Sequence, residues 1–395
     1  MIDPARHVPL QSTPWSASEV SAAIEEIVAD AAAHFDAEGF WPSHPSEDGR
    51  PDGMANLWIG AAGMIWGLDY LARSGAARTR LDFRSALPRL REATAVEFAA
   101  REDYAVHGAF LQGDLGTAVV AMRIDPSADI ADLVHEHCER NSALPVRELM
   151  WGLPGSMLAC VHMHAMTGEP RWQHLFAAQA LRLFDDLVET PLGPLWNQDL
   201  YGDVLPWLGP VHGYAGNMIP LLRGWKWLTP FQQARVADVV PRTLTATACR
   251  SNAGATWRVI ATRTGPPDIC QHCHGAPGMV TTFADAPFAS PELEALLVEG
   301  GTYTWAAGPL AKGSNLCHGT GGNGYAFLKL HRRTGDPIWL ERARAFAMTA
   351  IAQCREARAG LGRGRFSLWT GDVGLAIYLR DCITAEPHFP TVDVI

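Results

Sequence analysis

The chain of 395 residues carries a formal charge of −10, and 48% of its residues are hydrophobic. This composition excludes a disordered protein, because it supplies ample apolar surface for a core. The negative charge repels a phosphate backbone and no basic stripe offsets it, so nucleic-acid binding is not expected. The length exceeds that of a usual single core, which leaves two domains or one large closed architecture such as a barrel or toroid.

The first 54 residues are expected to hold one outer helix and a loop. The opening sequence "MIDPARHVPLQSTPW" has no apolar stretch behind a basic segment, so no secretory signal is predicted. The apolar run at 57–68 is too short to span a bilayer. We therefore expect a cytoplasmic protein without a transmembrane segment, whose eight cysteines are reduced thiols or metal ligands. Residues 40–53, rich in Pro, Gly and Ser, are predicted to form a loop.

A glycine pair, G-x-x-G, followed by an apolar segment, occurs seven times in residues 55–395. Each interval between the pairs has room for an outgoing helix, a turn and a returning helix. Because glycine permits close backbone approach, such pairs suit the crowded end of a ring of inner helices. The pairs begin at Gly60, Gly113, Gly152, Gly213, Gly275, Gly319 and Gly371.

Amphipathic segments lie between the glycine pairs, and two clear examples span residues 170–189 and 336–357. Alternation typical of strands is scarce, and residues 251–267 are predicted to form a second long loop. The expected fold is therefore all-α: an α/α toroid of seven inner and seven outer helices, treated as a single domain over residues 1–395, with the seven repeat units in 55–395.

The tripeptide Cys-His-Gly occurs at two of the glycine pairs. Cys273, Cys317 and His318 would give three protein ligands, the number typical of a catalytic zinc site with one open position. Cys270 and His272 flank the first motif, so a redox pair or a four-ligand structural site stays open from spacing alone. The other five cysteines are interpreted as small buried hydrophobic residues.

Histidine precedes the glycine pair at a third turn, where "VHGYAG" places His212 at the same offset as His274 and His318. An imidazole facing a metal can act as a general acid or base near neutral pH. Glu148, four residues before Gly152, is a candidate for holding the tautomer of a histidine.

The motifs "CHGAPG" and "LCHGTGGNGYAFL", the preceding "HGYAG", and "FSLWTGDVGLAIYL" with "HFPTVDVI" near the end resemble the lanthionine synthetase C family. The resemblance spans residues 55–395. His274 stands where many bacterial cyclases of the family carry tyrosine, and Lys312 lies five residues before Cys317, as in glutathione-binding members. These two features favour the LanC-like branch.

The resemblance implies a zinc enzyme that forms thioethers, with Cys273, Cys317 and His318 as ligands and His212 as the acid/base near Glu148. His274, which shares the position before the glycine pair, is a further catalytic candidate. The expected reaction adds a thiol to dehydroalanine or dehydrobutyrine, either within a dehydrated peptide or with a small thiol such as glutathione, which Lys312 would help to bind.

Two other functions are weighed against thioether formation. The first is a non-catalytic scaffold that keeps the zinc and binds peptides. The second is a glycan-processing toroid, which needs a carboxylate pair across the cavity. The acids at the glycine turns, Asp114 and Asp372, have no evident role of that kind, so this second function is disfavoured.

Overall fold

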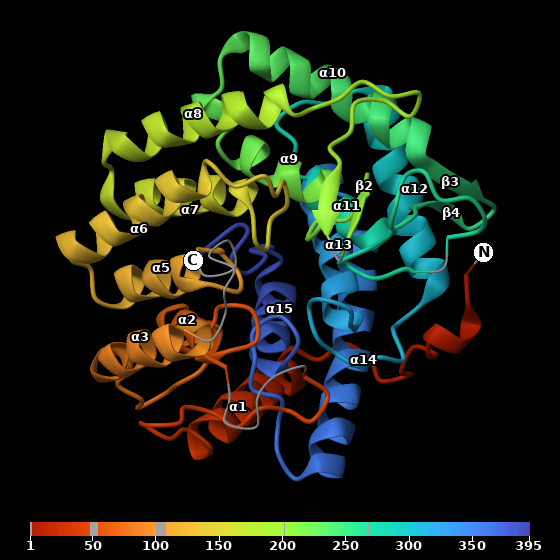
Figure 1. Ribbon diagram of the computed structural model, residues 1–395. Helices are drawn as coiled ribbons and strands as arrows, with labels where there is room; N and C mark the ends of the chain where they lie inside the picture. The colour runs from red at the N-terminus through yellow and green to blue at the C-terminus, as the bar shows by residue number, and fades with distance from the viewer. Residues whose placement is uncertain (1, 48–53, 100–107, 201, 268) are drawn as a thin grey trace.

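The computed structural model describes residues 2–47, 54–99, 108–200, 202–267 and 269–395. These residues are mostly helical and form a ring of paired helices, with two short β-hairpins (Figure 1). The predicted all-α toroid is confirmed. The full helix count stays a prediction, because residues 48–53 and 100–107 lie outside the described part of the chain. The division at residue 54 also stays a prediction.

The inner wall of the ring is built from the helices that follow the glycine pairs. Within the described residues, each of the seven pairs supplies the N-cap of a helix through its first glycine. Each inner helix contacts the next along the chain, and the last contacts the first, which closes the ring. They are α2 (Ala61–Arg73), α5 (Asp114–Ile124), α7 (Leu153–Thr167), α9 (Tyr214–Arg223), α11 (Ala276–Phe283), α13 (Thr320–Thr334) and α15 (Asp372–Thr384).

The second glycine of a pair lies in the first helical turn, where the preceding loop folds back onto the helix. At Gly322, for example, a Cβ atom would lie 1.8 Å from the carbonyl oxygen of Leu316, so no side chain fits. The glycine pair therefore permits the close packing of loop on helix that the sequence pattern predicted.

The loops before the inner helices gather at one end of the ring and hydrogen-bond to one another. Their backbone bonds run from the N–H of one loop to the carbonyl of another and link most of the loops around this end. They join Trp58 to Leu111, Leu111 to Met150, Leu149 to Val211, Cys273 to Cys317, Cys317 to Trp369 and Trp369 to Trp58, over 2.9–3.3 Å.

The outer helices return the chain and cover the inner ring. Several begin at a side-chain cap: the Ser16 hydroxyl accepts from Glu19 N–H, and Thr229 and Gln232 form a capping box. The predicted helices at 170–189 and 336–357 correspond to α8 (Pro170–Asp185) and α14 (Pro337–Leu361). The outer helices are α1 (Ala17–Ala33), α3 (Phe83–Ala99), α6 (Ala128–Asn141), α8 (Pro170–Asp185), α10 (Pro230–Thr247), α12 (Pro291–Ala307) and α14 (Pro337–Leu361).

Two antiparallel hairpins interrupt the helical pattern. Strands β1 (Gln198–Leu200) and β2 (Asp203–Leu205) pair, as do β3 (Ala248–Ser251) and β4 (Gly254–Trp257). The prediction of a long loop over 251–267 is wrong for β4, which packs against α12 and buries Trp257. The short strand was missed because four residues are too few for an alternating pattern to stand out.

The core lies between the two layers of helices and fills the ring with large side chains. Trp66, Trp172 and Trp257 are buried there with exposures of 1% or less. Two short 3-10 turns, Pro4–Arg6 and Trp225–Trp227, complete the described elements. Among the described helices, none combines the length and apolar character needed to cross a bilayer.

Candidate active site

The loops at the gathered end of the ring carry all seven of the predicted site residues. Glu148 precedes α7, His212 precedes α9, Cys273 and His274 precede α11, and Lys312, Cys317 and His318 precede α13.

Cys273 and Cys317 are brought together. Both thiols are buried, and the Cys273 N–H donates to the Cys317 carbonyl at 3.0 Å. A hydrogen bond between the thiols lowers the pKa of Cys273 and raises that of Cys317, because the proton kept on one sulfur stabilises the thiolate on the other. The Gln271 amide donates to Cys273 Sγ at 2.9 Å, and the charges of His212 and Lys312 also favour this thiolate.

The third predicted ligand, His318, follows Cys317 directly. Burial lowers its imidazole pKa to about 4, helped by the charges of Lys312 and Arg365, so the ring is neutral at neutral pH and has a lone pair to offer. Two thiols and a neutral imidazole are donors that zinc prefers. Across the described ranges, however, no three Cys, His, Asp or Glu side chains lie in a metal-binding arrangement. The donor chemistry fits zinc, and the ligand set stays a prediction.

His212 is oriented by Glu148. The His212 Nδ1–H donates to Glu148 Oε2 at 2.9 Å, and the carboxylate is fully buried. Glu148 also accepts the backbone N–H groups of Met150, at 3.1 Å, and of Trp151. Three donors thus hold the carboxylate, and the carboxylate in turn fixes which histidine nitrogen carries the proton.

His274 lies beside His212, with ring centroids 6.4 Å apart and ring planes inclined by 28°. Burial lowers its pKa to about 3, and the neighbouring His212 adds to the shift. Two indoles flank the imidazole pair. The ring centroids of Trp151 and His212 are 5.6 Å apart, and those of Trp207 and His274 are 6.1 Å apart. Gly275, with a φ of 111°, turns the chain from His274 into α11.

The structure separates Cys270 from the thiol pair. Cys270 is directed toward the Thr304 hydroxyl on outer helix α12, and burial raises its pKa to about 12. The neighbouring His272 is buried against the aromatic ring of Phe389 instead. Cys273, and not Cys270, therefore meets Cys317, and its role as the functional thiol of the first motif stays a prediction.

Lys312 is exposed at the edge of a pocket of about 160 Å³ near the His318 loop. Three arginines line this pocket as well: Arg358, Arg363 and Arg365. Sequence reasoning selected Lys312 and missed the arginines, although Arg365 lies only six residues before the last glycine pair.

Glu47 is a further residue that sequence reasoning missed. It accepts hydrogen bonds from Arg365 at 2.6 Å, Ser367 at 3.0 Å and Thr370 at 2.5 Å. Its loop comes more than 300 residues earlier in the chain, so no local pattern indicated the contact.

The fold and the site define an α/α toroid that carries, at one end, a buried thiol pair and a histidine oriented by a carboxylate. A family model described as "Lanthionine synthetase C-like protein" matches residues 133–394. The chain belongs to the lanthionine synthetase C-like family. The sequence-based expectation of a LanC-like protein is therefore confirmed.

Two curated relatives match shorter segments. "Glutathione S-transferase LANCL1" of Danio rerio is 34% identical over 131 residues, which are 32% of this chain and 32% of the relative. "LanC-like protein GCL1" of Arabidopsis thaliana is 41% identical over 92 residues, 22% of this chain and 20% of the relative. The alignments thus span a third or less of the length of these relatives.

Among solved structures, "Nisin cyclase" resembles this fold with a TM-score of 0.61. The match covers 92% of this chain and 94% of that chain at 12% identity. This likeness supports the toroid fold and nothing finer.

Proposed function

We propose that this protein joins a thiol to the β-carbon of dehydroalanine or dehydrobutyrine and so forms a thioether. The observation that carries the proposal is the site itself, where a buried thiol pair lies near a histidine held by a buried carboxylate. The family membership and a relative named as a glutathione S-transferase support the same class of reaction.

The reaction conserves protons. The substrate thiol loses its proton and its sulfur bonds to the alkene β-carbon, while the alkene electron pair moves toward the α-carbon and its carbonyl. The resulting enolate then takes one proton at the α-carbon. His212 suits this last step, because Glu148 fixes its tautomer and keeps the ring aligned.

Zinc is proposed as the cofactor, with Cys273, Cys317 and His318 as the residues that would hold it. Bound there, zinc would stabilise the anion of an incoming thiol at neutral pH. The contact with Cys317 and the amide of Gln271 lower the pKa of Cys273, and His318 is neutral. Zinc binding would release the proton that Cys317 keeps, because the metal takes a thiolate.

The pocket with Lys312 favours a small anionic thiol as one substrate. Its cationic side chains match the carboxylates of a thiol such as glutathione. A peptide that carries both the thiol and the alkene is the other candidate substrate.

The experiment compares two dehydroalanine peptides with zinc-loaded protein, one containing an internal cysteine and one incubated with glutathione. Mass spectrometry and thiol titration separate cyclisation from adduct formation. We expect Lys312→Ala to raise the KM for glutathione, whereas the matched control Lys226→Ala, at an exposed lysine elsewhere, leaves it unchanged. Absence of both products from folded, zinc-loaded protein would contradict the enzymatic proposal and favour the scaffold alternative.

A further inference from the structure

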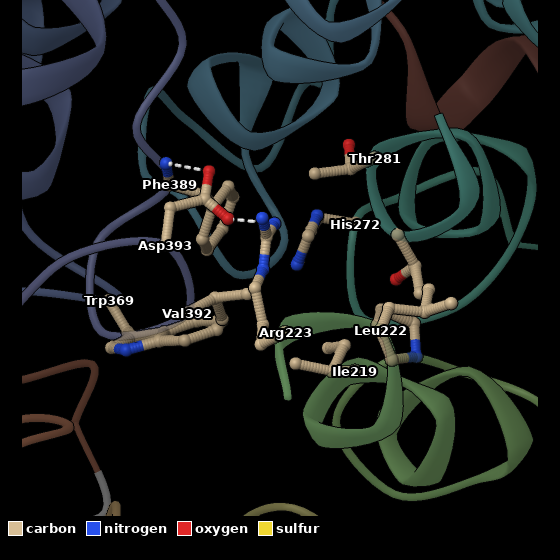
Figure 2. Close-up of a pocket in the computed structure, with 11 residues that line it drawn as sticks. Ile219, Leu222, Arg223, His272, Thr281, Trp369, Phe389, Val392 and Asp393 are labelled. Carbon is tan, nitrogen blue, oxygen red and sulfur yellow. Dashed lines mark hydrogen bonds and ion pairs between the residues drawn. The ribbon is translucent and has the colours of Figure 1, made fainter. Parts of the chain in front are cut away.

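The segment of residues 388–395 lies inside the ring of inner helices. His162 on α7 contacts the Thr391 carbonyl oxygen at 2.9 Å through Nε2. Asp393 pairs with Arg223 on α9 and with Lys329 on α13. Three inner helices from different parts of the ring therefore hold this short segment, and Figure 2 shows Asp393 and Phe389 facing Arg223 and His272.

Asp393 is fixed by several partners at once. Besides the two cations, it accepts the Phe389 N–H at 2.7 Å, which closes a tight turn. Both Lys329 and the carboxylate are nearly inaccessible to solvent, at 0% and 5% exposure. Buried charges of opposite sign hold their geometry because separating them leaves an uncompensated charge. Thr391 within the turn has a φ of 64°, a conformation that non-glycine residues keep only where the surroundings enforce it.

The 388–395 segment touches the first thiol turn through an aromatic stack. The rings of Phe389 and His272 lie 4.3 Å apart and 14° from parallel. His272 is 3% exposed and immediately precedes Cys273. Its Nδ1 has no hydrogen-bond partner among the described residues, so this nitrogen does not orient the ring. Packing against Phe389 is therefore one restraint on the turn that carries Cys273, beside the backbone hydrogen bond from Cys273 to Cys317.

The same segment touches the second thiol turn through Trp369. The indole N–H of Trp369 donates to the Thr391 hydroxyl at 3.3 Å, and its ring lies 5.2 Å from that of Phe389. The Trp369 carbonyl accepts the N–H groups of Leu316 at 3.0 Å and Cys317 at 2.9 Å. One residue thus connects the segment to the backbone of Cys317.

The cavity at this place is too small to bind a substrate. It holds about 10 Å³ between Arg223, His272, Phe389 and Asp393, which is room for at most one water molecule. The polar and aromatic groups gathered there therefore support structure rather than bind a ligand.

We propose that the 388–395 segment positions the active site by clamping both thiol turns, with Phe389 and Asp393 as positioning residues. Phe389 acts on Cys273 through His272, and Thr391 acts on Cys317 through Trp369. The segment sets the spacing of the two sulfur atoms, which a shared metal or thiol substrate needs within a fraction of an ångström. A catalytic role of the clamp rests on the proposed function, because the clamp positions the two thiols of that same site.

The test measures how fast each cysteine reacts with iodoacetamide in the native, metal-free protein, with peptide mass spectrometry assigning each site. Cys138 on α6 and Cys354 on α14 are buried thiols outside the site and serve as internal references. The variant is Phe389→Leu, and its matched control is Phe346→Leu, the same change at a fully buried phenylalanine on α14.

We expect Phe389→Leu to raise the labelling rate of Cys273 and Cys317 at least tenfold relative to Cys138 and Cys354. Phe346→Leu should leave those ratios within twofold of the original protein. Phe389→Tyr, which keeps the flat ring, should restore most of the protection. Asp393→Asn, if folded, should act like Phe389→Leu.

Unchanged ratios in Phe389→Leu, or an equal rise in Phe346→Leu, would overturn the clamp. This readout requires no catalytic turnover. A protein that fails to form thioethers can therefore still support the clamp, and an active protein with unchanged ratios would refute it. In an active protein, the clamp further predicts a lower kcat for Phe389→Leu with the KM for glutathione nearly unchanged.

Discussion

Replacing Glu148 by glutamine tests the histidine–carboxylate pair with little change of shape. In the folded protein, one carboxylate oxygen accepts the Trp151 N–H, and the other accepts both Met150 N–H and His212 Nδ1–H. Glutamine has only one accepting oxygen. Whichever way the amide is placed, its NH₂ group faces at least one N–H donor, and a donor is left unsatisfied in a buried site.

The expected magnitudes follow from these contacts. A buried donor without a partner costs about 1–3 kcal/mol of stability. Loss of the charge weakens the hydrogen bond to His212 by about 1.4 kcal/mol, the difference between a charged and a neutral acceptor. If His212 transfers the proton, that loss corresponds to a decrease of about tenfold in kcat. We therefore expect a lower thermal unfolding midpoint together with a tenfold or larger loss of thioether formation.

The control is Glu97→Gln, the same change at another buried carboxylate. Glu97 accepts the Ala55 N–H at 2.6 Å and the Asn56 amide at 3.1 Å, with no histidine among these partners. It should lose stability while keeping its activity at temperatures below unfolding. Thermal unfolding and single-turnover thiol addition to a dehydroalanine peptide measure both effects. Equal activities in Glu148→Gln and Glu97→Gln would refute a catalytic role for the pair.

Three further outcomes are expected. His212→Asn should slow thiol addition on the order of 10²-fold while leaving bound zinc in place, as metal analysis would show, and turnover near that of the original protein would direct attention to His274. Cys270→Ser should keep bound zinc whereas Cys273→Ser should lose it, as metal analysis would show; the reverse pattern would reassign the first ligand. Burial raises the pKa of Asp381 from 3.8 to about 7, so between these two pH values the folded protein keeps a proton that the unfolded chain releases. The contribution of this carboxyl group to stability therefore falls as the pH rises from 3.8 to about 7. Asp381→Asn should flatten that fall in thermal unfolding across the same pH range, and an unchanged slope would contradict the assignment.

Local sequence determined the elements that repeat and the residues that carry the chemistry. The glycine pairs predicted where inner helices begin, because only glycine tolerates contacts such as that between Gly322 and the Leu316 carbonyl. The two Cys-His-Gly motifs selected Cys273 and Cys317, which the structure brings together. The third metal ligand does not follow from the motif alone, because a ligand set depends on where side chains point as well as on their order.

The tertiary structure decided the contacts that closing the ring creates. Glu148 and His212 are 64 residues apart and meet only because adjacent inner helices present their loops at one end. Glu47 reaches Arg365 across 318 residues. The sequence by itself thus determined the ring-forming units and the chemical groups at their turns. Only the closed toroid determined which groups are neighbours. The periodicity of apolar residues indicates which face of a helix is buried, but it carries no information on the distance between segments that come together when the ring closes.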